Sequence, residues 1–331
     1  MKLYTDYTGK FQMYLPINWE YKNPSLYSPI QESLPQSFGM YDKALGAFQI
    51  SCKPITEHIK ELIKTRNEPL QSSDSEKLEF SEQLISQDKM KVYAFSCAVD
   101  DHYFFSTYIV TPTQRTLKTI DKELSEVRKV LSSIKFIKPK FRDIIITQRR
   151  TDLYMASIAT IIELKNKAIE KDSYIEYIVF SANHIDALLR LSIILNNQII
   201  NGNDEIDLKL LFQSENDKAI MERTIYKQCL HLRIIDQHLF DELESLYKER
   251  NKVIHRYIIT DIRTEDIFKI ATNYEKIFES IDNLILRLEA QQVEKKIGIW
   301  GNINNTKLSE TDREILYTKI RDKQGRLPKR K

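Results

Sequence analysis

The stretch KFIKPKFRD, residues 135–143, separates two kinds of sequence pattern in a chain of 331 residues. It is basic, and its Pro139 lacks a backbone donor and interrupts regular elements. Before this stretch apolar residues alternate as in strands, and after it they recur at helical spacing. We therefore predict a two-domain α+β protein, with domains over residues 1–137 and 150–297, a linker over 138–149 and a tail over 298–331.

The N-terminal domain has the pattern of an antiparallel sheet combined with helices. Two of its apolar runs lie on either side of Asp100 and Asp101, which is typical of a hairpin. Strands and helices in one segment indicate a mixed α/β unit. The expected strands are residues 11–15, 47–52, 92–99 and 103–110, and the expected helices are residues 56–65 and 120–133.

The second domain has helical patterning almost throughout, which favours an all-α bundle of four or five long helices. The polar tail that follows ends in a basic run, and its residues 309–312 (SETD) offer a cap for one short helix. The helices expected in the bundle are residues 152–170, 175–198, 217–230, 236–257 and 264–293.

Composition argues against several classes of site. With seven glycines the chain contains no Gly-rich phosphate loop, and its six histidines include no H-E-x-x-H. Its three cysteines are scattered, which fits reduced thiols in a core better than a disulfide or zinc site. We therefore expect neither a cofactor nor a metal. A net charge of +3 is too small to indicate nucleic-acid binding by itself.

No run of about 18 uncharged apolar residues occurs, and the first 25 residues contain five charged side chains within a mixed pattern. This argues against a membrane span and against a secretory leader. We therefore expect a cytoplasmic protein with no membrane partner.

Residues 250–257, RNKVIHRY, carry the most informative side chains of the predicted helix over 236–257. Arg250 occupies a position of the apolar seam where leucine is expected. A buried guanidinium is costly without a partner, so Arg250 should meet a carboxylate, a second subunit or a substrate phosphate. Asp186, on an earlier predicted helix, is our candidate for the acidic partner, and Glu249 is an alternative.

His255 follows Arg250 by five residues, so their side chains should diverge by about 140° around an ideal helix. Asn251 and His255 share a face, and Tyr247 lies one turn earlier on it. Arg250 and His255 therefore cannot both face one ligand from a single straight helix. Either the helix is distorted, or two copies meet across a two-fold axis to form one groove.

The pattern R-N-x-x-x-H-x-Y resembles the signature of the HEPN superfamily, helical domains that occur in toxins, antiphage proteins and RNA-guided effectors. The resemblance covers about residues 150–295. It implies a homodimer and a metal-independent endoribonuclease, acting as a toxin or abortive-infection effector on RNA. It also implies a possible antitoxin or another defence protein as partner. In some HEPN toxins a nucleotide is added to the tyrosine of this pattern, and Tyr257 is at the matching position.

The site residues suit RNA transesterification, in which a 2′-hydroxyl attacks the adjacent phosphate without a metal. His255 would act as general base or acid. Arg250 would hold phosphate oxygens, and Asn251 would orient the imidazole or the phosphate. Tyr257 would stack on a base or bond the backbone, with Tyr247 and Asp186 in support.

A second, fainter resemblance concerns the N-terminal domain. Residues 11–19, FQMYLPINW, and the order of elements are similar to the PsbP-like α/β/α sandwich. That fold implies a sensor, partner-binding or regulatory role rather than one chemistry. Two other readings of the whole chain stay open. One is a non-catalytic HEPN module that binds RNA or a protein, and the other is an assembly protein that dimerises through its helices.

Overall fold

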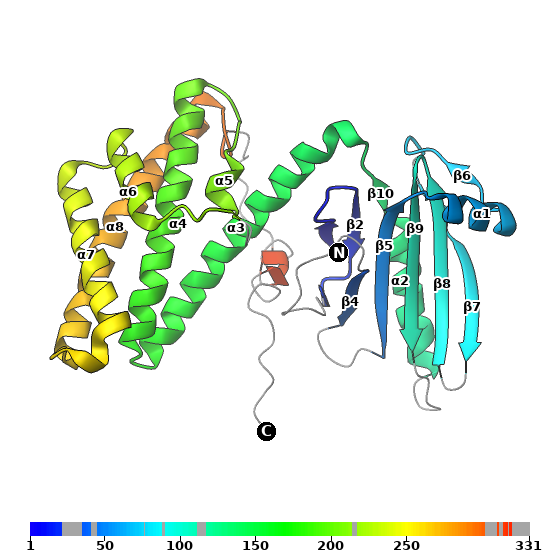
Figure 1. Ribbon diagram of the computed structural model, residues 1–331, viewed down its shortest axis with the longest axis horizontal. Coiled ribbons are helices and arrows are strands. Elements are labelled where there is room, and N and C mark those ends of the chain that lie inside the picture. Colours follow the sequence, from blue (N-terminus) through cyan, green and yellow to red (C-terminus); the bar gives the residue numbers. More distant parts are fainter. Residues whose placement is uncertain are drawn as a thin grey trace. The chain divides into compact units, whose positions relative to one another are not determined.

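The structure, a computed structural model, describes residues 1–21, 35–40, 45–75, 77–87, 90–110, 117–213 and 217–301, with 310, 314–316 and 318–319. The chain divides into two compact units, and the division falls inside one helix, between Arg149 and Arg150. Figure 1 traces both units along the chain. The first unit is rich in strands and the second is helical, so the predicted two-domain α+β class is confirmed.

Two sheets form the frame of the N-terminal unit. The smaller has the strand order β1-β2-β10, and the larger has the order β3-β4-β5-β9-β8-β6, with β7 also paired to β8. All pairings are antiparallel except β6 with β8. The strands are β1 Lys2–Thr5, β2 Phe11–Leu15, β3 Trp19–Tyr21, β4 Gln36–Met40, β5 Gly46–Pro54, β6 Leu70–Gln71, β7 Ser81–Gln87, β8 Met90–Val99, β9 His102–Val110 and β10 Lys135–Phe136.

The predicted hairpin is confirmed as β8 and β9, whose register runs from Lys91 opposite Val110 to Val99 opposite His102. Asp100 adopts a left-handed φ of 49° in the turn, a conformation that aspartate tolerates better than most residues. The strands missed by sequence patterning are short or lie at a sheet edge. β7, for example, keeps residues 81–85 exposed, so its sequence has no buried face to read.

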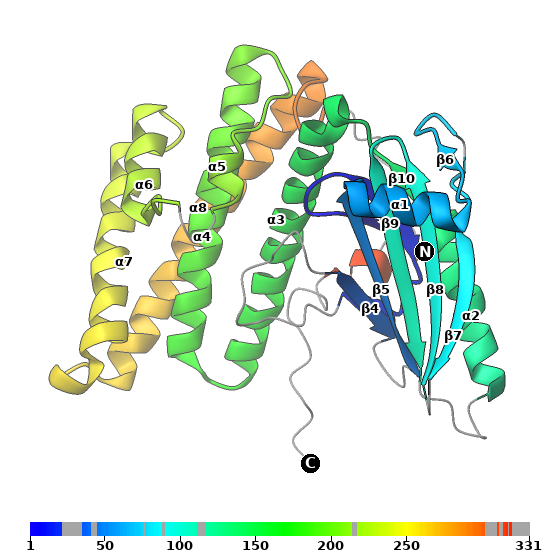
Figure 2. The ribbon, with the colours of Figure 1, turned by 45° about the vertical axis from the view of Figure 1, so that its right-hand side comes forward.

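Helix α2 (Leu117–Ser132) supplies much of the core of this unit. It buries apolar side chains at helical spacing, among them Leu124 and Val127, against β2 and β9. Figure 2 shows α2 running along one face of the larger sheet. Helix α1 (Glu57–Arg66) contributes no buried residue. Its first turn is capped by Thr56, whose side chain accepts from the backbone amide of Ile59.

Helix α3 (Pro139–Glu170) replaces the predicted linker over residues 138–149. Pro139 is the first residue of the helix, where its missing N–H would have no intrahelical partner and its fixed φ suits the turn. The proline therefore starts a helix instead of interrupting one. Within the first unit, Arg149 donates from Nε to the backbone oxygen of Thr5 at 3.0 Å.

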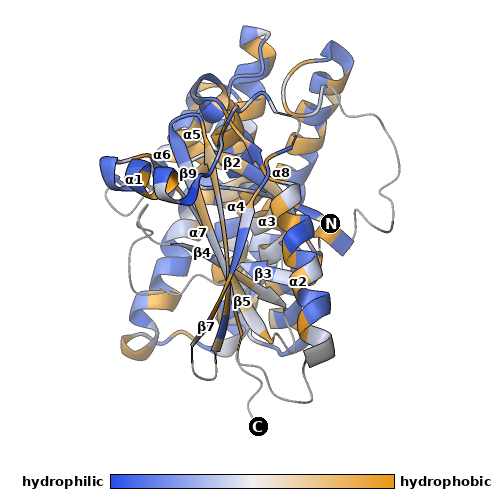
Figure 3. Cartoon of the chain, turned by 90° about the vertical axis from the view of Figure 1, so that its right-hand side faces the viewer, coloured by the Kyte–Doolittle hydropathy of each residue, from blue (hydrophilic) through white to orange (hydrophobic). Residues whose placement is uncertain are grey.

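The C-terminal unit packs its helices around α4 (Tyr174–Asn201), half of whose residues are buried. Hydrophobic and hydrophilic residues share the same helices (Figure 3), as expected for amphipathic helices around one core. The predicted helices are confirmed with shifted ends. The remaining elements are α5 Leu208–Leu211, α6 Glu222–His231, α7 Gln237–Arg256, η1 Tyr257–Ile259 and α8 Thr264–Lys295.

Helix α4 is long and apolar enough to cross a membrane by length and composition alone, the one such helix among the described residues. In the folded unit, 72% of its apolar window is buried against other helices. It also carries His184, Asp186 and Arg190. A core helix of a soluble protein has these properties.

The segment predicted to begin the polar tail is packed at its start. The buried side chain of Gln198 accepts from the backbone amide of Ile299, and that of Gln292 accepts from Trp300. Gly298 has a left-handed φ of 73° and donates from its backbone to Asp204 at 2.6 Å. Among the described residues, the helical unit thus continues through Gly301. Of the short helix expected in the tail, residues 310, 314–316 and 318–319 are helical, and the rest lies outside the described residues.

Candidate functional site

Helix α7 carries the residues singled out by the sequence. Asp236 caps it, accepting from the backbone amide of Leu239 at 2.8 Å. Leu243, Leu246 and Val253 are buried and define the face that packs on the core. The opposite face is therefore open to solvent along the whole helix.

Arg250 is held by a carboxylate that the sequence did not reveal. Its Nη1 lies 2.6 Å from Oε2 of Glu222 in the first turn of α6, and the two side chains are 15% and 13% exposed. The guanidinium also lies over the ring of Tyr247, 4.9 Å from its centroid. Its Nη2 donates to Oδ1 of Asn251 at 3.3 Å. Arg250 therefore links α6 to α7 and holds Asn251.

Glu222 also accepts a hydrogen bond from the Tyr226 hydroxyl. Burial raises the pKa of Tyr226, and the neighbouring Glu222 carboxylate raises it further, so the phenol stays protonated. Burial opposes the charge on Arg250, but Glu222 outweighs it and raises the pKa of the guanidinium. The arginine is thus a permanent cation in a nearly dry setting.

Asp186, the predicted acidic partner, does not pair with Arg250. Its Oδ2 accepts from Nε of Arg190 at 2.7 Å, one turn along α4, and Arg190 also donates to the backbone oxygen of Ile220. The i and i+4 spacing on one helix gives Asp186 a nearer partner than any residue of α7. Burial raises the pKa of Asp186, while the charges of Arg190 and Arg250 lower it. Asp186 therefore interacts with Arg250 only through the electrostatic effect of their charges and makes no hydrogen bond to it.

His255 and Asn251 lie on the outer side of α7, as their spacing predicts. His255 is exposed, and Lys248 and Lys252 are exposed on the same side of the helix. Arg250 faces α6 instead, so the predicted divergence of Arg250 and His255 is observed. The outer face thus presents an imidazole, an amide and two ammonium groups; we call these four residues, Lys248, Asn251, Lys252 and His255, the α7 strip.

Tyr257 lies just beyond α7, in the short helix η1. It is 42% exposed, while Ile258 and Ile259 are 94% and 79% exposed. Tyr257 also lines a cavity of about 250 Å³ with Tyr174 and the start of α8. The predicted helix over residues 236–257 includes Tyr257, but α7 ends at Arg256 and the Tyr257 side chain is accessible.

A second group of titratable side chains lies in the core, between α3, α4 and α8. His184 is 2% exposed, and its ring centroid lies 4.7 Å from that of Phe278. The buried Lys165 ammonium lies 4.1 Å from the same phenyl centroid and 3.8 Å from Glu275, which also accepts from the Tyr177 hydroxyl. Nδ1 of His184 is buried without a hydrogen-bond partner among the described residues.

This setting predicts a pH-dependent loss of stability. Burial, reinforced by the Lys165 charge, lowers the pKa of His184 from 6.5 to about 4. Between those values the unfolded chain binds a proton that the folded chain does not, so the free energy of unfolding should fall as pH drops from 6.5 to 4. Below pH 4 His184 is protonated in both states, so it lowers the free energy of unfolding no further. The loss from His184 is at most about 3 kcal/mol.

Denaturant titrations at several pH values measure this slope. We expect the variant His184→Met, which has no titrating group, to show a flatter dependence than the parent protein between pH 6.5 and 4. His231→Met, at an exposed position of α6, is the control and should keep the parent slope. Equal slopes for the parent and His184→Met would contradict the assignment.

The sequence missed Glu222, Tyr226, Lys165 and Glu275 as members of these networks. The only local signal is that Glu222 and Tyr226 lie one turn apart in a predicted helix. Among the described residues, no three His, Cys, Asp or Glu side chains cluster as metal ligands.

Comparisons with known proteins add little. No family model matches the chain, and no curated protein matches it. One similar solved structure is a crystal structure of a protein from Bacteroides thetaiotaomicron VPI-5482, with 10% identity, 55% of this chain and 76% of that chain covered, and a TM-score of 0.30. The solution structure of PsbP (CyanoP) from Synechocystis sp. PCC 6803 is a distant structural neighbour, with 11% identity, coverage of 41% and 92%, and a TM-score of 0.21. Neither likeness identifies a family or a function.

Proposed function

We propose that the C-terminal unit is a HEPN domain and acts as a metal-independent endoribonuclease. The protein would be a cytoplasmic toxin or antiphage effector of the abortive-infection type. The observation that carries this proposal is the arrangement on α7, where Glu222 holds Arg250 as a cation that bonds Asn251, while His255 lies exposed one turn beyond Asn251.

Each group has a role in the chemistry. His255 takes the proton from a ribose 2′-hydroxyl, whose oxygen bonds to the adjacent phosphorus as the bond from phosphorus to the 5′-oxygen breaks. The imidazolium formed at His255 then gives its proton to the leaving 5′-oxygen. Asn251 orients the imidazole or a phosphate oxygen, and Arg250 positions Asn251 through their 3.3 Å hydrogen bond. The arginine charge stabilises negative charge on the phosphate. Lys248 and Lys252 attract the RNA backbone to the α7 strip.

One subunit supplies only half of this site, because Arg250 and His255 face different ways. We propose that two copies pack with their α7 helices across a two-fold axis. Apolar side chains next to the strip support an interface there. Ile254, Ile258 and Ile259 are 41%, 94% and 79% exposed, an unusual run of open isoleucines beside a polar site.

The dimer leads to a direct prediction. Ile258→Asp combined with Ile259→Asp should convert a dimer to a monomer, because two charges would be buried against the partner. Sedimentation velocity measures the change, and RNA cleavage should fall with it. Ile200→Asp, at a position 67% exposed on α4, is the matched control and should leave the dimer intact. If the parent protein sediments as a monomer at micromolar concentration, the composite site is wrong.

The function itself is tested with the purified 331-residue protein and labelled single-stranded RNA in excess EDTA. We expect cleavage to persist, and the products to end in a 2′,3′-cyclic phosphate and a 5′-hydroxyl, because the 2′-oxygen displaces the 5′-oxygen. RNA that stays intact both in EDTA and in magnesium would remove the enzymatic proposal.

A second candidate is a non-catalytic module that binds RNA or a partner protein through the same strip. The observation in its favour is that Glu222 and Asn251 already occupy Arg250, which limits its reach toward a phosphate. Here Lys248→Ala with Lys252→Ala would weaken RNA binding while no variant or buffer yields cleavage. In either case we propose that the N-terminal α/β unit is the sensor or partner-binding module.

A further inference from the structure

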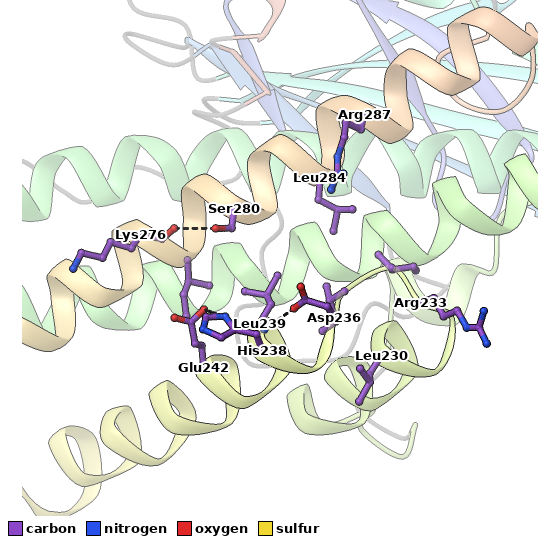
Figure 4. A pocket seen from close by; sticks show the side chains of 13 residues that line it. Leu230, Arg233, Asp236, His238, Leu239, Glu242, Lys276, Ser280, Leu284 and Arg287 are labelled. Atoms are coloured by element: carbon purple, nitrogen blue, oxygen red, sulfur yellow. Dashed lines mark hydrogen bonds and ion pairs between the residues drawn. The ribbon is translucent and has the colours of Figure 1, made fainter.

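The C-terminal unit contains a groove that the proposed RNA site does not use. Its volume is about 800 Å³, and it lies between the start of α7, the turn from α6 to α7, and α8 (Figure 4). Helices α7 and α8 touch further along, where the Tyr274 hydroxyl donates to the backbone oxygen of Leu246 at 3.3 Å. The groove opens from that contact toward the N-terminus of α7. None of Arg250, Asn251 and His255 lines it.

The floor of this groove is apolar. Ile277 and Leu284 of α8 are 5% and 7% exposed, and Leu239 of α7 is half-buried opposite them. Figure 4 shows Leu239 and Leu284 in the space between the two helices. These residues belong to or pack against the main core, so the floor is rigid and already formed. An occupant therefore gains by burying apolar side chains here.

The rim carries unbalanced positive charge. Arg233, Lys276 and Arg287 are exposed, and within the part of the chain that the structure describes no carboxylate forms an ion pair with any of them. The rim also carries two carboxylates, Glu242, which lies 3.4 Å from His238, and Asp236, which caps α7, so the three cations exceed the carboxylates by one formal charge. Arg233 is fixed in the turn by a left-handed φ of 55°.

We propose that this groove docks an amphipathic helix of a partner protein, with apolar side chains along one face and acidic side chains on its flanks. An elongated apolar floor between two helices fits the apolar stripe of a third helix. The three rim cations would meet carboxylates on both flanks. A second copy of this groove is a poor occupant, since its cations would repel these. A nucleic acid would match the cations and leave the apolar floor unfilled.

The experiment uses the 331-residue protein and a fluorescein-labelled peptide of about 18 residues, about 27 Å long as a helix. The peptide carries leucine at helical spacing on one face and glutamate on the flanks. We expect saturable binding by fluorescence anisotropy. Lys276→Glu combined with Arg287→Glu should weaken binding at least about tenfold. The same double variant should bind a peptide with lysine flanks more tightly than the parent protein does.

Two controls make the outcome decisive. Lys295→Glu changes an exposed charge at the far end of α8 and should leave binding unchanged. Leu239→Asp should abolish binding of both peptides, with the far-ultraviolet circular dichroism preserved. Absence of saturable peptide binding to the parent protein overturns the proposal. The proposal is also overturned if Lys295→Glu weakens peptide binding as much as Lys276→Glu combined with Arg287→Glu does. It is overturned, too, if single-stranded RNA displaces the peptide from the parent protein but not from that double variant.

Discussion

His255→Ala should lower the rate of RNA cleavage by about 10²–10⁴-fold, the range expected for loss of a general acid or base. The side chain is exposed and has no hydrogen-bond partner among the described residues, so its removal leaves packing unchanged. The free energy of unfolding should therefore shift by no more than about 0.5 kcal/mol. Single-turnover cleavage in EDTA and denaturant titration measure the two quantities on the same preparation.

The matched control for this variant is His238→Ala. His238 lies on the same helix, and its side chain is 82% exposed, but it faces the groove beside α8. Its loss should leave cleavage unchanged. Equal activity of His255→Ala and the parent protein would exclude His255 as the acid or base. If added imidazole restores RNA cleavage by the His255→Ala variant, this would support a proton-transfer role for His255.

Arg250→Met should destabilise the protein by about 3–5 kcal/mol, because it leaves the Glu222 carboxylate nearly buried without its partner. Glu222→Gln should cost less, since a neutral amide keeps a hydrogen bond to the guanidinium. The double variant should lose less than the sum of the two single losses. Denaturant titrations of all four proteins form the cycle that measures this coupling.

The pair Arg223 and Glu244 is the control for this cycle. It also joins α6 to α7, with Nε of Arg223 2.7 Å from a carboxylate oxygen, but the arginine side chain is 47% exposed. Arg223→Met should therefore cost under about 1 kcal/mol. Strict additivity at positions 222 and 250 would mean that the ion pair does not hold the two helices together.

Most helices of this protein are predictable from the sequence, and several strands are not. α4, α7 and α8 repeat apolar residues over many turns, so their presence follows from local spacing. β1, β3 and β10 have two to four residues each, too few to establish a period of two. Such strands exist because a partner strand completes their hydrogen bonds. Pro139 was misread because the same ring that disrupts a helix interior is favourable at its first position.

The candidate site divides in the same way. The spacing of residues 250, 251 and 255 determines by itself that Asn251 and His255 share a face and that Arg250 does not. Which carboxylate meets Arg250 was decided by the packing of α6 against α7, which brings Glu222 from 28 positions earlier in the chain. Asp186, the predicted partner, instead forms an ion pair with Arg190 on its own helix.

The sequence by itself determined the two-domain α+β class, the long helices and the angular order of side chains around α7. Only the tertiary structure decided the Glu222 partner, the exposure of Tyr257 and the charged groove between α7 and α8. The physical reason is the range of the interactions involved. Helical periodicity is set by backbone geometry within a few residues, whereas ion pairs and grooves between helices depend on the packing of segments that are distant in the chain.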